Sequence, residues 1–237
     1  MKVLYRILLH ALVLGLLSGI FLTGIQQIEV VPLILEAESY EVSDQSGHSH
    51  HNNEDHEQKH ESQNDDTEWL RLGYTALANF LLAVGFALLL SVLANILVAR
   101  KHIFVWHTGC VMGFSGFLIF HLAPALGLPP KLPGSEAAAV EWRQAWWIFT
   151  VVATAAGLAL LLLQKKLYLR LISIIFVLIP HILGAPVVQD DSSLLPVELE
   201  KRFVIVSLIT NLCFWLVLGA LVGVLNKKMQ IKRQIFK

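Results

Sequence analysis

Long, uninterrupted runs of apolar residues dominate this sequence. Six of them reach about 20 residues or more, the length that a helix needs to cross roughly 30 Å of hydrocarbon. They lie at residues 3–25, 72–99, 103–123, 145–163, 167–188 and 203–225. No strand-like alternation of apolar and polar residues competes with them. The predicted fold class is therefore all-α, a polytopic membrane helical bundle with about six transmembrane helices.

The composition supports a membrane protein over a soluble one. Of the 237 residues, 55% are hydrophobic and 15% are charged, and the mean hydropathy is +0.62. A soluble domain of this composition would lack the polar side chains needed to cover its surface. The two cysteines, Cys110 and Cys213, both lie inside apolar runs, so no disulfide framework is indicated.

The positions of Lys and Arg predict the topology, because positive charge near helix ends is retained in the cytoplasm. If both termini are cytoplasmic, the cytoplasmic segments hold twelve Lys and Arg residues, and the opposite segments hold six. Part of this excess is a basic tail at residues 227–237. The alternative for the first run is a cleaved signal peptide, but the run is long and is followed by Gln26 and Gln27 instead of small residues.

Acidic residues avoid the predicted cytoplasmic segments altogether. Twelve of the eighteen lie between Glu29 and Glu68. The other six lie in later external connections: Glu136, Glu141, Asp190, Asp191, Glu198 and Glu200. An anionic surface of this kind raises the local concentration of cations.

The connection at residues 39–68 differs from the rest of the chain. It holds acidic residues interleaved with five histidines: His48, His50, His51, His56 and His60. It has too few apolar residues to bury a core, so we expect an extracytoplasmic loop that is disordered without a ligand. Imidazole and carboxylate groups bind divalent first-row metal ions, and the loop is predicted to gather them. The alternative is a solvated linker whose histidines bind nothing.

Polar side chains inside the spans are costly and mark candidate functional residues. Those toward the external face are Gln26, Gln27, Glu29, Asn79, His121, Arg143, Gln144, His181 and Asn211. Those toward the cytoplasmic face are His10, Asn95, His107 and Cys110. We expect His121 and His181 to contact a transported ion or its pathway. For Asn79 and Asn211, hydrogen bonding between helices is the alternative.

Two further patterns concern helix packing. Glycines four residues apart, at Gly15 with Gly19, Gly109 with Gly113 and Gly219 with Gly223, predict close helix contacts within one bundle in preference to a dimer interface. The connection at residues 122–134 contains four prolines and two glycines, so it cannot be helical throughout. Its apolar residues predict that it packs back against the bundle.

Several separated motifs resemble one known family. They are residues 126–134 followed by Arg143-Gln144-Ala145-Trp146-Trp147, residues 32–38 (PLILEAE), residues 180–186 (PHILGAP), residues 207–211 (SLITN) and the pair Phe214-Trp215. On these residues the chain resembles the CbtA family of predicted cobalt transporter subunits. The resemblance covers nearly the whole chain apart from the His-rich loop and the basic tail.

The resemblance implies a multi-pass protein of the bacterial inner membrane that takes up cobalt for cobalamin synthesis. It also implies a partner, a small single-span CbtB-type subunit carrying histidines, with cobalt ion as substrate and no organic cofactor. By the same comparison Glu36, Glu38, His181 and Asn211 gain support as metal-contacting residues. The chain departs from the family at Lys131, where an acidic residue is expected, and at His121, where an apolar residue is common.

The sequence is also compatible with other metal-transport functions. A nickel or zinc permease and a metal-resistance exporter share the same features. A membrane enzyme or assembly factor is disfavoured, because the acidic residues lie outside the membrane while both thiols lie within the spans. The sequence has no phosphate-binding glycine loop and no nucleic-acid-binding motif, so we expect no enzyme activity and no nucleic-acid partner. Membrane lipid surrounds the bundle.

Overall fold

The computed structural model describes residues 2–46, 60–99, 106–187 and 195–235, and all regular secondary structure in these residues is helical. The elements in chain order are α1 (Lys2–Ile25), η1 (Gln26–Val30), α2 (Val31–Ser46), α3 (His60–Ala99), α4 (Trp106–Phe117), η2 (Leu118–Leu122), α5 (Ala123–Ala125), α6 (Val140–Leu163), α7 (Leu167–Leu183) and α8 (Val197–Ile235). The segments η1 and η2 are π-helical turns, which occur most often at functional sites.

Five helical stretches are long and apolar enough to cross a membrane: Ile7–Tyr40, Glu68–Val98, Trp106–Ala125, Val140–Leu163 and Val197–Asn226. They correspond to five of the six predicted spans, and they confirm an all-helical membrane protein. The sixth predicted span, at residues 167–188, is the apolar helix α7, which has 17 residues. It ends early because Gly184 adopts a left-handed conformation with φ of 81°. A helix of this length lies at the lower limit for spanning a bilayer.

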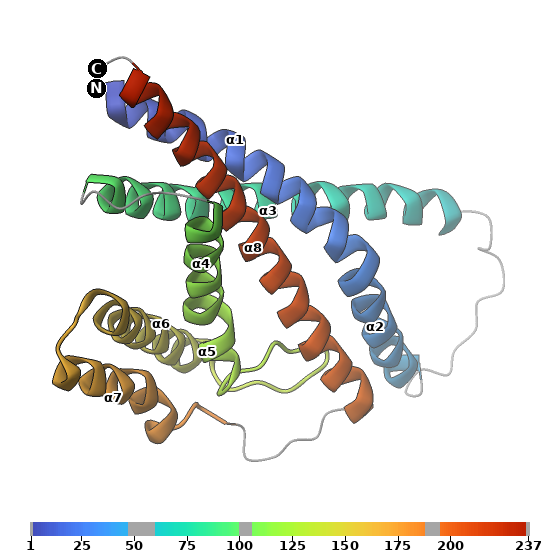
Figure 1. Cartoon of the computed structure of the whole chain (residues 1–237). Helices are drawn as coiled ribbons and strands as arrows, with labels where there is room; N and C mark the ends of the chain where they lie inside the picture. Colours follow the sequence, from blue (N-terminus) through green and yellow to red (C-terminus); the bar gives the residue numbers. More distant parts are fainter. Residues whose placement is uncertain (1, 47–59, 100–105, 188–194, 236–237) are drawn as a thin grey trace.

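The helices pack as neighbouring pairs (Figure 1). α1 lies along α3, α4 lies along α8, and α6 and α7 form a hairpin at one side. The first turns of α1 and the last turns of α8 lie at the same end of the bundle. We call the opposite end, where η1 and the first turns of α8 lie, the distal end.

Glycine contacts hold two of these pairs together. A Cβ atom on Gly109 of α4 would lie 2.1 Å from the carbonyl oxygen of Gly219 on α8, and one on Gly113 would lie 2.2 Å from that of Trp215. On α1, a Cβ atom at Gly15 would lie 2.7 Å from the Cα atom of Val84 on α3. The predicted glycine pairs therefore mediate backbone contacts within one bundle.

The distal end has a small core of its own. Leu33 and Ala37 of α2 are buried with Leu132 of the proline-rich connection, with Leu195 just before α8, and with Leu199 and Phe203 in the first turns of α8. This confirms that the connection packs back against the bundle. Residues 39–46 and 60–68, expected to belong to a disordered loop, lie in α2 and α3. The distal core accounts for the first of these two stretches, because it anchors α2. Once α2 is anchored, each added helical residue costs little, so the helix extends into polar sequence.

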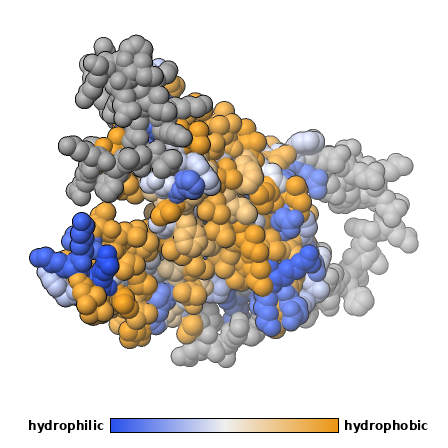
Figure 2. All heavy atoms as spheres, in the orientation of Figure 1, coloured by the Kyte–Doolittle hydropathy of each residue, from blue (hydrophilic) through white to orange (hydrophobic). Residues whose placement is uncertain are grey.

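Much of the molecular surface is apolar. Figure 2 shows hydrophobic side chains over most of the described surface on one face, with hydrophilic residues gathered toward the edges. Exposed large apolar residues occur along α1, α3, α6 and α7. A soluble protein rarely exposes patches of this extent, whereas lipid covers them at no cost.

Candidate functional site

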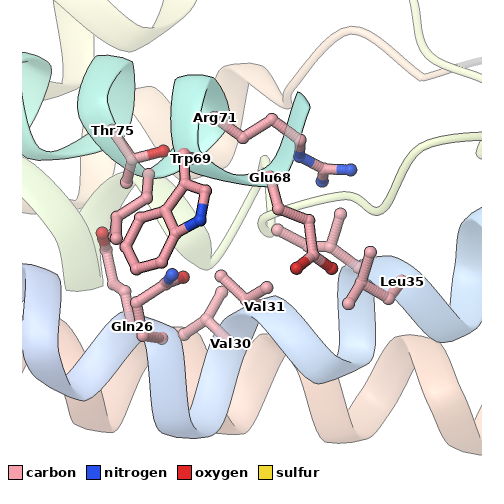
Figure 3. Close-up of a pocket in the computed structure, with 11 residues that line it drawn as sticks. Gln26, Val30, Val31, Leu35, Glu68, Trp69, Arg71 and Thr75 are labelled. Carbon is pink, nitrogen blue, oxygen red and sulfur yellow. The ribbon is translucent and has the colours of Figure 1, made fainter. Parts of the chain in front are cut away.

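The first polar cavity lies at the distal end, between η1 with α2 on one side and the first turns of α3 on the other. Its volume is about 640 Å³. The residues that line it are Gln26, Gln27, Val30, Val31, Ile34, Leu35, Glu68, Trp69, Arg71, Leu72 and Thr75. Figure 3 shows Gln26, Trp69 and Thr75 at one end of this cavity and Glu68 with Arg71 toward the other. We call it the α1–α3 cavity.

An amide network closes the inner side of the α1–α3 cavity. The Nδ2 atom of Asn79, a buried residue of α3, donates to Oγ1 of Thr23 at 3.1 Å and to Oε1 of Gln26 at 2.6 Å. Gln26 begins the π-helical turn, in which the backbone N–H of Val31 donates to the carbonyl of Gln26, five residues earlier. Beyond this network the interior is mostly apolar, with Leu14, Leu22 and Ala83 tightly packed, and it also holds the buried hydroxyl-bearing residues Ser18 and Ser91.

An ion pair stands at the mouth of the α1–α3 cavity. The guanidinium of Arg71 donates two hydrogen bonds to the carboxylate of Glu38, each 3.1 Å long. This pairing neutralises Arg71, so Glu68 supplies the unbalanced charge of the lining. Both partners are well exposed, with side-chain exposures of 51% and 37%, and the pair adds little to stability. The pair joins α2 to α3 and leaves the cavity weakly anionic.

The second cavity, of about 620 Å³, lies between η2, the proline-rich connection, α6 and α8. Its lining consists of Phe120, His121, Pro124, Ala125, Leu128, Pro129, Pro130, Lys131, Val140, Arg143, Gln144, Trp147, Ile148, Leu208 and Asn211. It therefore gathers four predicted site residues: His121, Arg143, Gln144 and Asn211. We call it the α6–α8 cavity.

His121 is held by hydrogen bonds from two directions. The indole Nε1–H of Trp215 donates to His121 Nδ1 at 3.1 Å. Because an indole can only donate, Nδ1 accepts, and the proton of the neutral imidazole lies on Nε2. The Asn211 side chain also hydrogen-bonds with His121, while Asn211 Nδ2 donates to the carbonyl of Ser207 at 2.8 Å. A metal ion would have to displace one of these bonds to reach the imidazole.

The charge of the α6–α8 cavity is opposite to that of the α1–α3 cavity. Lys131 and Arg143 both line it, and no carboxylate does. Two unopposed positive charges raise the free energy of a bare dication at this place. The His121 and Asn211 pair therefore sits in an electrostatic environment that suits an anion better than a cation.

The other predicted site residues are dispersed. His181 on α7 packs edge-on against Trp146, with ring centroids 6.0 Å apart, and does not line the cavity that contains His121. Glu29 and Glu36 are exposed on η1 and α2. Within the described part of the chain, no group of three or more His, Cys, Asp and Glu side chains is arranged to hold a metal ion.

At the end of the bundle that holds the termini, His10 is half-buried on α1, and His107 is exposed at the start of α4 with its ring 3.8 Å from that of Trp106. Four histidines of the His-rich loop lie outside the described residues: His48, His50, His51 and His56. The fifth, His60, is the first residue of α3.

Sequence reasoning did not single out several residues of the two cavities. They are Thr23, Glu68, Trp69, Arg71, Thr75 and Trp215. Glu68 and Arg71 were counted only as charges in a connection, and nothing in the sequence pairs Arg71 with Glu38, which is 33 positions away. Trp215 belongs to one of the motifs quoted for the family resemblance, but its bond to His121 follows only from the antiparallel packing of α4 on α8.

A comparison with known families agrees with the resemblance noted in the sequence. The model of the family described as "Probable cobalt transporter subunit (CbtA)" matches residues 4–227, nearly the whole chain. Neither the curated proteins nor the solved structures gave a significant match.

Proposed function

Because the chain belongs to the CbtA family, a family of probable cobalt transporter subunits, we propose that it imports cobalt ions for cobalamin synthesis. In this proposal it is a multi-pass protein of the bacterial inner membrane with both termini in the cytoplasm, so the distal end faces outward. Family membership implies a transporter subunit and not an enzyme. We attribute the selectivity for cobalt to the transport route through the bundle and to the partner subunit, and not to a preformed cluster of metal ligands.

The observation that carries this proposal is the α1–α3 cavity. It offers the amide oxygens of Gln26 and Gln27, the hydroxyl of Thr75 and the carboxylate of Glu68. Oxygen acceptors of this kind hydrogen-bond the water shell of a hydrated dication, and the single unbalanced negative charge favours a cation. The volume of about 640 Å³ leaves room for an ion with its water. We assign the first binding step to this cavity.

The His-rich loop supplies the ion to this cavity. His60, the last of its histidines, begins the same helix, α3, that carries Glu68 two turns later. In the proposal, imidazoles of the loop bind cobalt weakly and pass it to Glu68, with Glu29, Glu36 and Glu38 adding negative charge nearby. Weak binding is an advantage here, because an ion that binds tightly at the mouth would not move on.

The inward route follows the contact between α1 and α3. From Gln26 it meets the Asn79 network, passes the packed interior and leaves beside His10 and His107. A membrane potential of about 100 mV, negative inside, favours inward movement of a dication by about 4.6 kcal/mol. The interior beyond Asn79 is closed in this structure, so transport requires the α1–α3 contact to open. A metal role for His121, His181 and Asn211 stays a prediction.

The description as a subunit implies a partner. We propose that the partner is the small single-span CbtB-type subunit, whose histidines supply ligands beyond the amide network. In the part of the chain that the structure describes, no three metal-binding side chains meet, and a second subunit in contact with the opened passage would make up that deficit.

Accumulation of labelled cobalt tests the proposal. Cells without their own cobalt uptake should accumulate more labelled cobalt when they express the chain together with its small partner. A tenfold excess of unlabelled nickel or zinc should compete less well than the same excess of unlabelled cobalt. Lower cobalt in expressing cells would point to an exporter, and equal competition by nickel or zinc would point to a general permease. Either result would contradict the proposal.

A further inference from the structure

In the part of the chain that the structure describes, two basic residues of the α6–α8 cavity form no ion pair with an acidic side chain. Arg143 is half-buried in the first turn of α6 and forms no ion pair within the described residues. The Nζ atom of Lys131 donates to the backbone carbonyl of Glu136 and not to a carboxylate. The carboxylate of Glu200 accepts a hydrogen bond from Ser135 at 2.9 Å and lines an adjacent smaller cavity, which Lys131 and Arg143 also line. Glu200 does not line the α6–α8 cavity itself, whose charged lining residues are Lys131 and Arg143.

Apart from these two cations and the polar side chains of His121, Gln144 and Asn211, the lining is apolar, and it reaches the membrane-facing surface. Phe120, Trp147, Ile148 and Leu208 form one wall. Ile148 is 55% exposed and Trp147 is 39% exposed, so this wall opens onto the surface that lipid covers. The cavity thus combines a basic end and an apolar end.

The level of the cavity in the membrane matches a lipid headgroup. Three tryptophans lie around the start of α6: Trp142, Trp146 and Trp147. Trp142 is 71% exposed. Exposed tryptophans mark the level at which headgroups meet hydrocarbon. At that level the basic end of the cavity faces the headgroups and the apolar wall descends beside the acyl chains.

We propose that the α6–α8 cavity binds an anionic phospholipid. The phosphate accepts hydrogen bonds from Arg143 and Lys131, and the Gln144 amide donates to the glycerol ester region. An acyl chain packs against Ile148 and Leu208. The bound lipid bridges α6 and α8, so it stabilises the position of the α6–α7 hairpin.

The apolar wall distinguishes a lipid from a free oxyanion. An inorganic phosphate or glycerol phosphate would use Arg143 and Lys131 but would leave the wall unfilled, and about 620 Å³ far exceeds what one phosphate occupies. An acidic segment of a partner protein would satisfy the charges but would give the purified chain no preference among lipids. A phospholipid, a free phosphate and an acidic partner segment therefore predict different results when the purified chain is titrated with lipids and with glycerol phosphate.

Thermal stability in detergent provides the measurement. The purified full chain is titrated with phosphatidylglycerol, with phosphatidylcholine of the same acyl chains, and with glycerol phosphate, while the midpoint of unfolding is followed. Phosphatidylglycerol should raise the midpoint in a saturable manner, because a ligand that binds only the folded state stabilises it. Phosphatidylcholine and glycerol phosphate should have much smaller effects.

Variants connect the effect to the cavity. Arg143→Gln should weaken phosphatidylglycerol binding by about tenfold, the usual effect of losing one charge-assisted hydrogen bond. Arg202→Gln removes the same charge from an exposed position near the start of α8, and it should leave the affinity unchanged. If the Arg143→Gln protein folds poorly, the Lys131→Gln protein provides a second measurement of the affinity for phosphatidylglycerol. An equal loss in Arg202→Gln, no preference for the anionic lipid, or full stabilisation by glycerol phosphate would each overturn the proposal.

Discussion

Replacing Gly109 with valine is expected to prevent the chain from accumulating as a folded membrane protein. A Cβ atom at this position would lie 2.1 Å from the carbonyl oxygen of Gly219 and 2.8 Å from the Cα atom of Gly223. Both of these atoms belong to the backbone of α8, so no side-chain rearrangement relieves the overlap. α4 and α8 would have to separate, and the loss of packing would cost more than about 3 kcal/mol.

The yield of monodisperse protein after detergent extraction measures this effect. Gly85→Val is the matched control, because it makes the same substitution in a membrane-spanning helix at an exposed position with no atom within 4 Å of the added Cβ. It should extract normally. If the Gly109→Val and Gly85→Val proteins are recovered in equal amounts, the α4–α8 contact is not the tight interface described here.

The second large effect is a loss of cobalt uptake when Asn79 is replaced with leucine. Asn79→Leu keeps the branched shape of the side chain but removes the donor that joins Thr23 and Gln26, and it lines the floor of the α1–α3 cavity with hydrocarbon. A dication moving inward from that cavity would meet no acceptor oxygen from Asn79. We therefore expect labelled cobalt uptake to fall by at least about tenfold, the factor that corresponds to about 1.4 kcal/mol in the barrier.

Asn226→Leu is the control for this variant. Asn226 is also buried, but its Nδ2 atom donates only to the carbonyl of Val222 in its own helix, at 2.9 Å. Its replacement should leave uptake near the wild-type rate. Extraction yield and unfolding temperature separate transport from folding in both variants. Normal uptake by a well-folded Asn79→Leu protein would exclude the amide network from the route.

Most of the fold could be predicted from the sequence because a bilayer allows few solutions. A run of apolar residues long enough to cross hydrocarbon must be helical, so the spans were evident without any knowledge of contacts. The extension of α2 into polar sequence was not predicted, since its cause is the contact of Leu33 and Ala37 with Leu132 and the start of α8. Hydropathy carries no information about such distal packing.

The candidate site was predicted in part, because helix pairing decides which polar residues meet. The contacts of Gly109 and Gly113 with Gly219 and Trp215 set an antiparallel register between α4 and α8. Continued for two further turns, that register brings His121 opposite Asn211. The glycine spacing was visible in the sequence, but it did not say which helix was the partner. For the same reason His121 and His181, predicted to act alike, lie in different surroundings.

The α1–α3 cavity was harder to predict because its charge depends on one ion pair. From the sequence, Glu38 and Glu68 are two of twelve acidic residues, and Arg71 is one of six external cations. The bidentate contact between Arg71 and Glu38 neutralises both and leaves Glu68 as the charged group of the lining. Such a pairing across 33 positions follows from the packing of α1 on α3, which brings the continuation of α1 through η1 into α2 close to the first half of α3, and from nothing local.

The central claim is that the α1–α3 cavity opens to the outside of the cell and receives the cation there. Labelling of a Thr75→Cys variant with a membrane-impermeant maleimide tests it, after Cys110 and Cys213 have been replaced by alanine. Thr75 lines the cavity and is half-buried, so a thiol at this position reports access to its interior. We expect the reagent to label the variant in intact cells. Labelling only after the membrane has been permeabilised would place the cavity on the cytoplasmic side and contradict the proposed direction of transport.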